Sequence, residues 1–196
     1  MARPKEFDRD AVLEKAMLVF WAQGYESTSL DELQKAMGIG RQSLYDTFGD
    51  KHALYLQALE RYKDSSSGAL QTCLDQAVSP LGAVRQLFTS LAEEPPAARR
   101  RGCMMVNAAV EMLPRDAKTA ELVSTNQRFI ETAFRRALQR SRQLGELPED
   151  ADVAGLARYL VATFQGLRVA AKAEMGPEAL RDVARHALRP LGPPSE

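Results

Sequence analysis

The chain contains 196 residues, of which 45% are hydrophobic and 27% charged, and its 26 Lys and Arg residues balance its 26 Asp and Glu residues. This length accommodates one or two domains with a sizeable core, and the composition is that of an ordinary soluble globular protein. A net charge of zero argues against a protein that coats nucleic acid, and two cysteines indicate a reducing cytosol and not a disulfide scaffold. Without an apolar run of about 18 residues or a signal peptide, we expect a cytoplasmic protein with no membrane association.

The first helix is predicted from Asp8 to Gly24. Asp8 is a suitable N-cap, and Gly24 supplies the glycine at which helices commonly end. Between them, the apolar residues at helical spacing are Leu13, Ala16, Met17 and Phe20. This stripe would cover the core of the elements that follow. Before this helix, Arg3 and Lys5 either contact DNA as a basic arm or have no role.

The stretch from residue 28 to residue 51 contains two short predicted helices joined by a glycine-bearing turn. Ser29 and Glu32 have the spacing of a capping box, although Thr28 allows a start one residue earlier. Gly38 suits the C-terminus of this helix, because it tolerates a positive φ. The second helix begins at Arg41 and turns its apolar residues inward. Two short helices in this arrangement predict a helix-turn-helix.

The outward face of the second helix carries residue types that can read base edges. Arg41 can bond guanine, Gln42 can bond adenine, and Ser43 can bond either base. Asp46 on the same face would be repelled by phosphate, so it either accepts from cytosine or points to solvent. The alternative for the whole face is a helical corner whose polar side chains are only solvated.

Other polar side chains of this region suit contacts to the DNA backbone. Contacts to phosphate set the register without reading sequence, and the residues placed for them are Tyr45, Thr47 and Lys51. However, residues 1–55 contain seven Lys and Arg against nine Asp and Glu, so the usual basic footprint of a DNA-binding domain is absent. Binding would then depend on a few placed cations, on backbone N–H groups and on the avidity of a dimer.

Residues 8–55 resemble the N-terminal DNA-binding domain of the TetR/AcrR family of bacterial repressors. The matching residues are Ala16, Phe20, Gly24, Tyr25, Thr28, Ser29, Leu33, Gly38, Ile39, Ser43, Leu44, Tyr45, Phe48, Lys51 and Leu54. The resemblance implies that Arg41, Gln42 and Ser43 read bases. It also implies that phosphates are held by the start of the helix at Ser29 and by Tyr45, Thr47 and Lys51. Asp46 departs from the pattern, since the family often has an aromatic, a histidine or a small polar residue there.

A longer helix is predicted from Asp50 onward, and a polar patch at residues 65–68 either bends it or ends it. In the family this helix links the DNA-binding head to the body, and its tilt sets the spacing of two heads. Another helix follows from Pro80. Residues 94–102 are predicted to form a loop, because consecutive prolines oppose helix. Their three arginines either hold an anionic ligand or form a solvated basic loop.

Cys103 begins an apolar helix that resembles the G-C-x-x-x-N stretch of part of the family. A cysteine near a helix N-terminus and next to arginines meets two conditions that lower a thiol pKa. Cys103 is therefore a candidate sensor of oxidants or electrophiles. The alternative is a small buried hydrophobe, which is the usual role of a cytosolic cysteine. Cys73 lacks a basic neighbourhood.

Three further helices are predicted, over residues 116–143, 152–174 and 177–189. The second of these is apolar on more than one face, which requires a partner beyond its own domain. Helices 152–174 and 177–189 are therefore expected to form a homodimer interface, and a symmetric dimer matches a palindromic operator. The alternative is that both helices are simply core.

The expected fold is all-α, with about nine helices in two domains: a three-helix helix-turn-helix domain over residues 1–55 and a helical effector-binding and dimerisation domain over residues 56–196. We expect a transcriptional repressor that a small apolar or amphipathic effector releases from double-stranded operator DNA. The candidate effector-pocket residues are Phe88, Cys103, Met104, Asn107, Gln127, Phe134, Phe164 and Arg168. No catalytic constellation, metal-ligand set or cofactor motif is present, so an enzyme is not expected. Two alternatives remain: a thiol-sensing repressor that uses Cys103, and a helical interaction module that no longer binds DNA.

Overall fold

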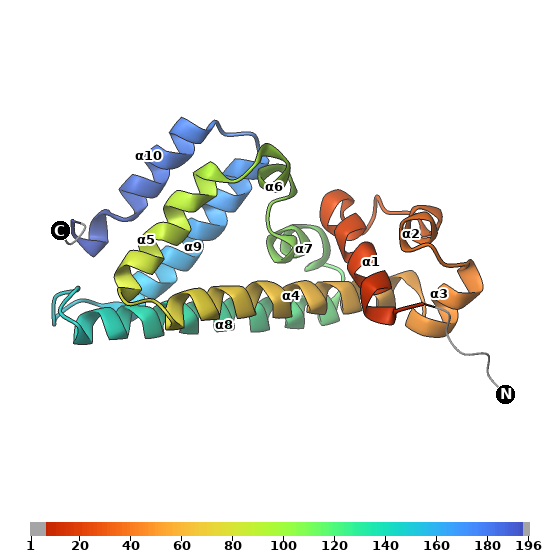
Figure 1. The fold of residues 1–196 in the computed structure, drawn as a ribbon, viewed down its shortest axis with the longest axis horizontal. Coiled ribbons are helices and arrows are strands. Elements are labelled where there is room, and N and C mark those ends of the chain that lie inside the picture. The colour runs from red at the N-terminus through yellow and green to blue at the C-terminus, as the bar shows by residue number, and fades with distance from the viewer. Residues whose placement is uncertain (1–6, 194–196) are drawn as a thin grey trace.

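The computed structural model describes residues 7–193, so Arg3 and Lys5 lie outside the described part of the chain. Within this part the protein is all-α, as predicted (Figure 1). The helices are α1 (Arg9–Gln23), α2 (Leu30–Met37), α3 (Arg41–Phe48), α4 (Lys51–Asp75), α5 (Pro80–Glu93), α6 (Pro96–Arg101), α7 (Met104–Met112), α8 (Ala117–Gln143), α9 (Val153–Lys172) and α10 (Pro177–Ala187), followed by a 3₁₀ turn (Arg189–Leu191). None of these helices is both long and apolar enough to cross a membrane.

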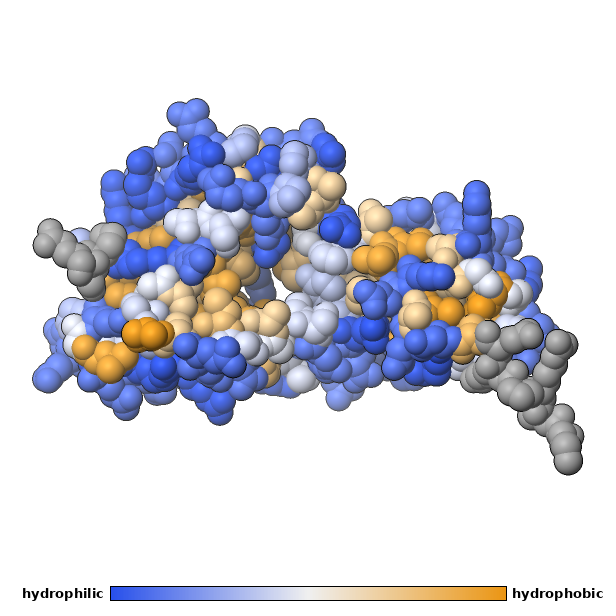
Figure 2. Space-filling view, viewed as in Figure 1, coloured by the Kyte–Doolittle hydropathy of each residue, from blue (hydrophilic) through white to orange (hydrophobic). Residues whose placement is uncertain are grey.

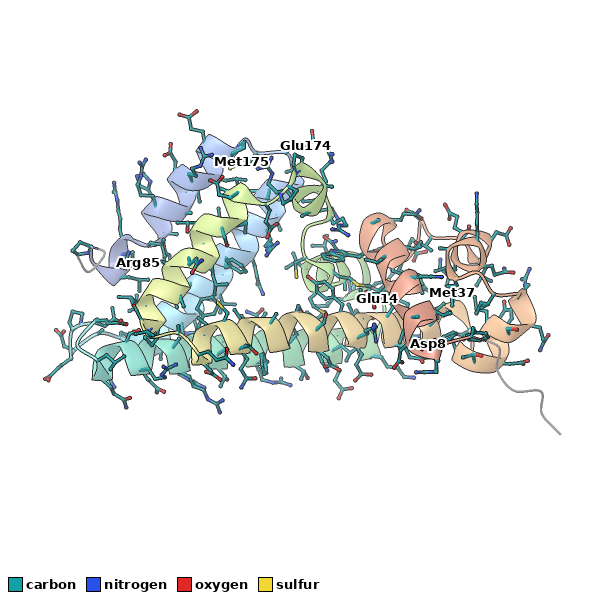
Figure 3. All side chains as sticks on the ribbon, in the orientation of Figure 1. Asp8, Glu14, Met37, Arg85, Glu174 and Met175 are labelled. Carbon is teal, nitrogen blue, oxygen red and sulfur yellow. The ribbon has the colours of Figure 1, made fainter. Side chains whose placement is uncertain are left out.

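The head consists of α1 to α3, and the predicted side-chain caps define the starts of α1 and α2. Asp8, labelled at the start of α1 in Figure 3, accepts from the backbone N–H of Asp10 at 2.9 Å. Ser29 and Glu32 form the capping box of α2, so the helix starts after Ser29. Thr28 is buried instead, and its hydroxyl donates to the Gly24 carbonyl at 2.6 Å. These contacts explain why the boundaries could be read from the sequence.

Two long helices, α4 and α8, lie side by side along the length of the molecule (Figure 1). The head lies at one end of this pair, and α5, α9 and α10 rise from the other end. The polar patch at residues 65–68 does not bend or end α4, because its hydroxyls find local and cross-helix acceptors. Ser65 donates to the Tyr62 carbonyl at 3.1 Å, and Ser67 bonds Asn126 on α8 at 3.2 Å.

The segment over residues 94–102 was expected to be a loop, and this prediction is wrong. Pro96 is the first residue of α6, a position where the missing N–H of proline costs nothing. The helix ends after Arg101, at Gly102 with φ 66°. Two of its arginines contact the protein: Arg99 donates to the Ala92 carbonyl at 2.9 Å, and Arg101 lies 4.6 Å from the Trp21 ring centroid.

Buried apolar residues form two separate cores. The body core joins α5, α8, α9 and α10 around Phe88 and Phe134. The head core joins α1 to α4, but it also includes side chains from α7: Met104, Met105, Ala108 and Met112. Helix α7 therefore belongs to the head by packing, although it follows α5 and α6 in the chain.

The C-terminal segment is fastened to the body by Arg85, which Figure 3 labels on α5. One of its nitrogens, Nη2, donates to the carbonyls of Leu191 at 3.0 Å and Gly192 at 2.6 Å. Partial burial lowers the pKa of this guanidinium. The turn between α9 and α10 contains Glu174, the one described non-glycine residue with a positive φ, at 64°.

Candidate DNA-binding surface and ligand cavity

The outer face of α3 is organised in stripes of residues four apart. Arg41 and Tyr45 share one exposed stripe, with the guanidinium carbon 5.9 Å from the ring centroid. Ser43 and Thr47 share a half-buried stripe on the flank of the helix. Gly40, the N-cap of α3, offers no side-chain cap. The N–H groups of the first turn of α3 are therefore left for an outside acceptor.

Asp46 is exposed, and it is engaged along the helix with Gln42. The amide nitrogen Nε2 of Gln42 donates to Oδ1 of Asp46 at 2.8 Å. A Gln side chain has two N–H donors and one oxygen acceptor, so one N–H and the oxygen of Gln42 stay available. The carboxylate thereby fixes the direction of the amide group that was predicted to read a base.

The two predicted phosphate contacts outside α3 are placed differently. Lys51, in the first turn of α4, lies with Nζ 4.4 Å from the Tyr25 ring centroid. Burial, followed by the charges of neighbouring carboxylates, raises the pKa of Tyr25, so the ring that supports Lys51 stays neutral. Ser29 is occupied by the helix cap, since its hydroxyl and its N–H both donate to Glu32, at 2.7 and 2.8 Å. Those hydrogen bonds lower the pKa of Glu32.

A cavity of about 440 Å³ that is open to solvent on one side lies among α4, α5, α7, α8 and α9. Its walls are mainly apolar, formed by Ala69, Leu70, Leu87, Met105, Val106, Ala109, Val110, Val123, Ile130 and Phe164. The polar lining residues are Tyr62, Ser66, Ser67, Cys103, Asn126, Gln127, Gln165 and Arg168. Figure 2 shows apolar surface gathered where the body helices meet α4, with hydrophilic side chains around it. A mainly apolar cavity with a few polar groups is typical of a small-molecule site.

Four of the eight residues predicted for an effector pocket line this cavity: Cys103, Gln127, Phe164 and Arg168. The other four do not line it. Phe88 and Phe134 are fully buried behind Phe164, with ring centroids 5.3 and 6.4 Å from its ring. Met104 is buried in the head core. Asn107 instead caps the end of α6, where its amide donates to the Arg101 carbonyl at 3.0 Å.

Several polar residues of the cavity were not predicted from the sequence. Tyr62 on α4 is almost fully buried, and burial together with the neighbouring Cys103 raises the pKa of its phenol. Asn126 is buried on α8, where it faces Ser67. The sequence does contain a signal for Asn126: its amide lies among apolar residues on the buried side of α8. A buried polar group requires a partner, which indicates a polar site nearby.

Helix α7 contacts the head at both of its ends. Before its first turn, the Gly102 carbonyl accepts from the indole N–H of Trp21 at 3.0 Å. In its last turn, the two carboxylate oxygens of Glu111 accept from the backbone N–H groups of Tyr25 and Glu26, at 3.0 and 2.8 Å. Gly24 permits this approach, because a Cβ there would lie 2.8 Å from Glu111. The opposite face of α7 lines the cavity, so one helix contacts both regions.

A further contact joins the start of α4 to the start of α8. His52 Nε2 lies 3.1 Å from Oδ2 of Asp116, the N-cap of α8. Burial alone would raise the pKa of Asp116, but hydrogen bonds from Thr119 and His52 outweigh it and lower the pKa to about 2.

Helix α9 and its C-cap residue present a stripe of small and apolar residues on the outside of the molecule. Its members are all exposed and recur at helical spacing: Tyr159, Ala162, Gly166, Val169 and Ala173. Tyr159 is 42% exposed and Val169 50%. Val183 on the neighbouring α10 is 41% exposed. The second apolar face expected for residues 152–174 is therefore present, and the other face packs in the body core.

A helix-turn-helix head joined to a helical body that contains an apolar cavity defines a class of DNA-binding transcriptional regulator. Comparison with known proteins supports the same class. Residues 12–58 match the family described as bacterial regulatory proteins, tetR family, and residues 77–187 match a tetracyclin repressor-like C-terminal domain. The chain is 37% identical over 186 residues to the uncharacterized HTH-type transcriptional regulator YezE of Bacillus subtilis (strain 168), covering 93% of this chain and 95% of that protein.

Two further comparisons extend over nearly the whole chain. It is 33% identical over 195 residues to the HTH-type transcriptional repressor ComR of Escherichia coli (strain K12), covering 95% of this chain and 90% of ComR. A cysteine-substituted variant of the TetR family regulator CifR, solved with 26-base-pair double-strand operator DNA, superposes with a TM-score of 0.82 at 34% identity, covering 96% of this chain and 98% of that one. This protein belongs to the TetR family of transcriptional regulators, which are not enzymes.

Proposed function

We propose that this protein is a cytoplasmic repressor that binds a palindromic operator as a homodimer and is released by a small effector. The observation that carries the proposal is the position of α7. The helix contacts the head through Glu111 and through Gly102, which lies just before its first turn, and it lines the cavity with its other face. An occupant of the cavity can therefore act on the orientation of the head.

The α3 face would read the operator in the major groove. Arg41 would bond guanine, and Gln42, oriented by Asp46, would use its free N–H and its oxygen on adenine. Ser43 would contact a base from the flank of the helix. The phosphates would be held by Tyr45, Thr47 and Lys51, and by the start of α2 near Ser29, whose own side chain is used in the cap. The CifR variant, 34% identical to this chain, was solved with double-strand operator DNA, which supports DNA binding by the head but does not bear on single residues.

The dimer would form through α9 and α10. The exposed stripe from Tyr159 to Ala173 is apolar, and its small residues Ala162 and Gly166 allow a second helix to approach closely. A two-fold axis at this stripe would place two heads on two half-sites. Dimerisation would also compensate for the acidic balance of each head, because two weak sites on one rigid body bind with avidity.

Release requires an effector that binds the DNA-free conformation more tightly than the DNA-bound one. An effector in the cavity would contact Met105, Val106 and Ala109 on α7. A shift of α7 would pull on Gly102 and Glu111, and through them on α1 and the turn that follows it. The heads would then no longer match the spacing of the half-sites.

The test is a selection of bound sequences from random duplex DNA, followed by titration of the selected duplex at several salt concentrations. We expect an enriched palindrome and an affinity that falls steeply with salt, with a log–log slope of about −0.9 per phosphate contacted. Arg41→Ala should weaken binding by about 1–3 kcal/mol and relax the preference at one base pair. Arg142→Ala, exposed at the far end of α8, is the matched control. A folded protein that enriches no sequence would contradict the proposal and favour an interaction module.

A second candidate is a repressor that senses oxidants or electrophiles through Cys103. It is favoured by one observation: Cys103 is half-buried, is the N-cap of α7 and lines the cavity. Against it, Arg99 and Arg101 are held at Ala92 and Trp21, so two of the three arginines that suggested an activated thiol have other partners. Both candidates share the operator, and only in the second would Cys103→Ser abolish the response.

A further inference from the structure

The charge of the cavity lining is concentrated in one residue. Among the described residues that line the cavity, Arg168 is the one Lys, Arg, Asp or Glu. The remaining polar groups are hydroxyls, amides and a thiol. The phenol of Tyr62 is kept neutral, because burial raises its pKa. The electrostatic character of the site therefore depends on what Arg168 contacts.

The charge of Arg168 is already compensated within the protein. Its Nη1 lies 2.9 Å from Oε1 and 3.0 Å from Oε2 of Glu94, and both side chains are about three-quarters buried. Its guanidinium carbon lies 5.3 Å from the Phe164 ring centroid. Glu94 does not line the cavity but lines an adjoining crevice beside Trp21, and this crevice shares Tyr62, Ser66 and Arg168 with the cavity. The ion pair thus lies in the wall between the two spaces.

The neutral polar groups are also paired with one another. Ser67 bonds Asn126 at 3.2 Å, and the amide of Gln165 donates to Gln127. Each amide has more donor and acceptor positions than this one bond uses. They can therefore bond a hydroxyl or carbonyl group of a ligand. They cannot neutralise an ionised group.

An ionised ligand would lose its hydration in this cavity without gaining a free partner. Removing an ion from water costs several kcal/mol even in a relaxed protein site. An anion that took Arg168 would leave the Glu94 carboxylate partly buried and unpaired, while a cation would find no acidic side chain among the lining residues that the structure describes. Both outcomes are unfavourable compared with binding an uncharged molecule.

We propose that the cavity selects an uncharged, largely apolar ligand, and that Glu94 is the specificity-determining residue because it neutralises Arg168. This inference rests on the proposed role of the cavity as the effector site. It identifies a residue outside the cavity lining as the source of discrimination against acids. Loss of the Glu94 charge would convert the site into one that accepts anions.

The test uses two fluorescent probes with the same ring skeleton, neutral N-phenyl-1-naphthylamine and its sulfonate, 8-anilinonaphthalene-1-sulfonate. With the full-length protein, we expect the neutral probe to bind at least about tenfold more tightly than the sulfonate. Ala109→Trp, which fills the cavity from α7, should remove this binding and so locates the probe. Glu94→Gln should tighten the sulfonate by about tenfold or more and change the neutral probe by less than about twofold.

The matched control is Glu93→Gln. The carboxylate of this adjacent residue pairs with Arg181 at 2.7 Å on the exposed surface, so both probes should bind as to wild type. The double variant Glu94→Gln with Arg168→Met should lose the gain in sulfonate affinity, because the freed cation is then absent. Thermal unfolding of each variant checks that the fold is retained. If Glu94→Gln does not fold, Arg168→Met is tested alone. It should leave the neutral probe bound, because an uncharged ligand does not depend on the Arg168 charge.

Three results would overturn the inference: equal affinity of the two probes in the wild-type cavity, an unchanged probe ratio in Glu94→Gln, or binding insensitive to Ala109→Trp. These measurements contain no DNA. A wild-type protein that selects a neutral probe but binds no operator would refute the proposed repressor function and not the selectivity. A wild-type protein that binds its operator but binds both probes equally would refute the selectivity and not the repressor function.

Discussion

Asp116 shows how one side chain can connect several elements. It caps α8 by accepting from the Thr119 N–H at 3.0 Å, and it also contacts His52 in the first turn of α4. Hydrogen bonds to a carboxylate favour its ionised form, which is why its pKa lies at about 2 although partial burial acts in the opposite direction. We therefore expect the charge of this carboxylate, at the head–body junction, to contribute to stability.

This residue makes stability depend on pH in a defined window. A carboxylate whose folded pKa is lower than its unfolded value contributes stability above the unfolded value, and that stability is lost as pH falls through the folded value. For Asp116 the window runs from about pH 4 down to about pH 2. Urea unfolding of Asp116→Asn should show a shallower loss of stability across this window than wild type, by up to about 2 kcal/mol, reduced by solvent screening.

Asparagine is itself a good N-cap, so the substitution removes the charge and keeps the cap. Asp150→Asn, in the exposed turn before α9, should retain the wild-type slope. If the Asp116→Asn and wild-type curves run parallel between pH 4 and pH 2, the carboxylate does not stabilise the junction.

At the scale of elements, α7 is the part whose role is least visible in the sequence. Its side chains serve two regions, because Met104 and Met112 pack in the head core while Val106 and Ala109 line the cavity. Glu111 adds hydrogen bonds to Tyr25 and Glu26, immediately after α1. We therefore expect α7 to hold the end of α1 in place.

Glu111→Ala should release this contact without unfolding the head. Hydrogen bonds to a charged acceptor are worth about 1.5–3 kcal/mol each, less where water has access, so the amides of Tyr25 and Glu26 should exchange with solvent about tenfold faster or more. Amide hydrogen exchange measured residue by residue checks this. Glu121→Ala, exposed on α8, should have no such effect. Faster exchange throughout α1 would instead indicate that Glu111 supports the whole head.

Capping residues and apolar periodicity in the sequence predicted most of the helices, but they did not predict which helix faces pack in a core and which line the cavity. The starts of α1, α2 and α8 follow from Asp8, Ser29 and Asp116, because capping depends on residues a few positions apart. The rule that proline opposes helix formation wrongly predicted a loop in place of α6, because Pro96 occupies the first position of the helix, where proline is tolerated. In the same way, periodicity shows that Phe134 and Gln127 face inward. It cannot show that one enters the core and the other the cavity.

For the whole molecule, the main expectation concerns assembly. Val169 belongs to the exposed stripe on α9, where a dimer would bury it. Val169→Arg would place an unpaired charge in that interface, and a dimer should weaken by at least about 100-fold. Sedimentation at several protein concentrations measures this change, and operator affinity should fall with it. Leu144→Arg, 59% exposed at the end of α8, should leave the dimer intact. If both variants sediment as wild type does, the interface lies elsewhere.

The methionines of α7 also bear on how such regulators can be recombined. A chimaera that joins residues 1–55 to the body of another protein would leave Met104, Met105, Ala108 and Met112 behind, and the head core would have an open side. In the chain, the rest of α4 and the whole of α5 and α6 separate residues 1–55 from the α7 residues that complete the head core. A functional exchange of DNA specificity would therefore have to transplant the surface of α3 alone, or else carry α7 along with the head.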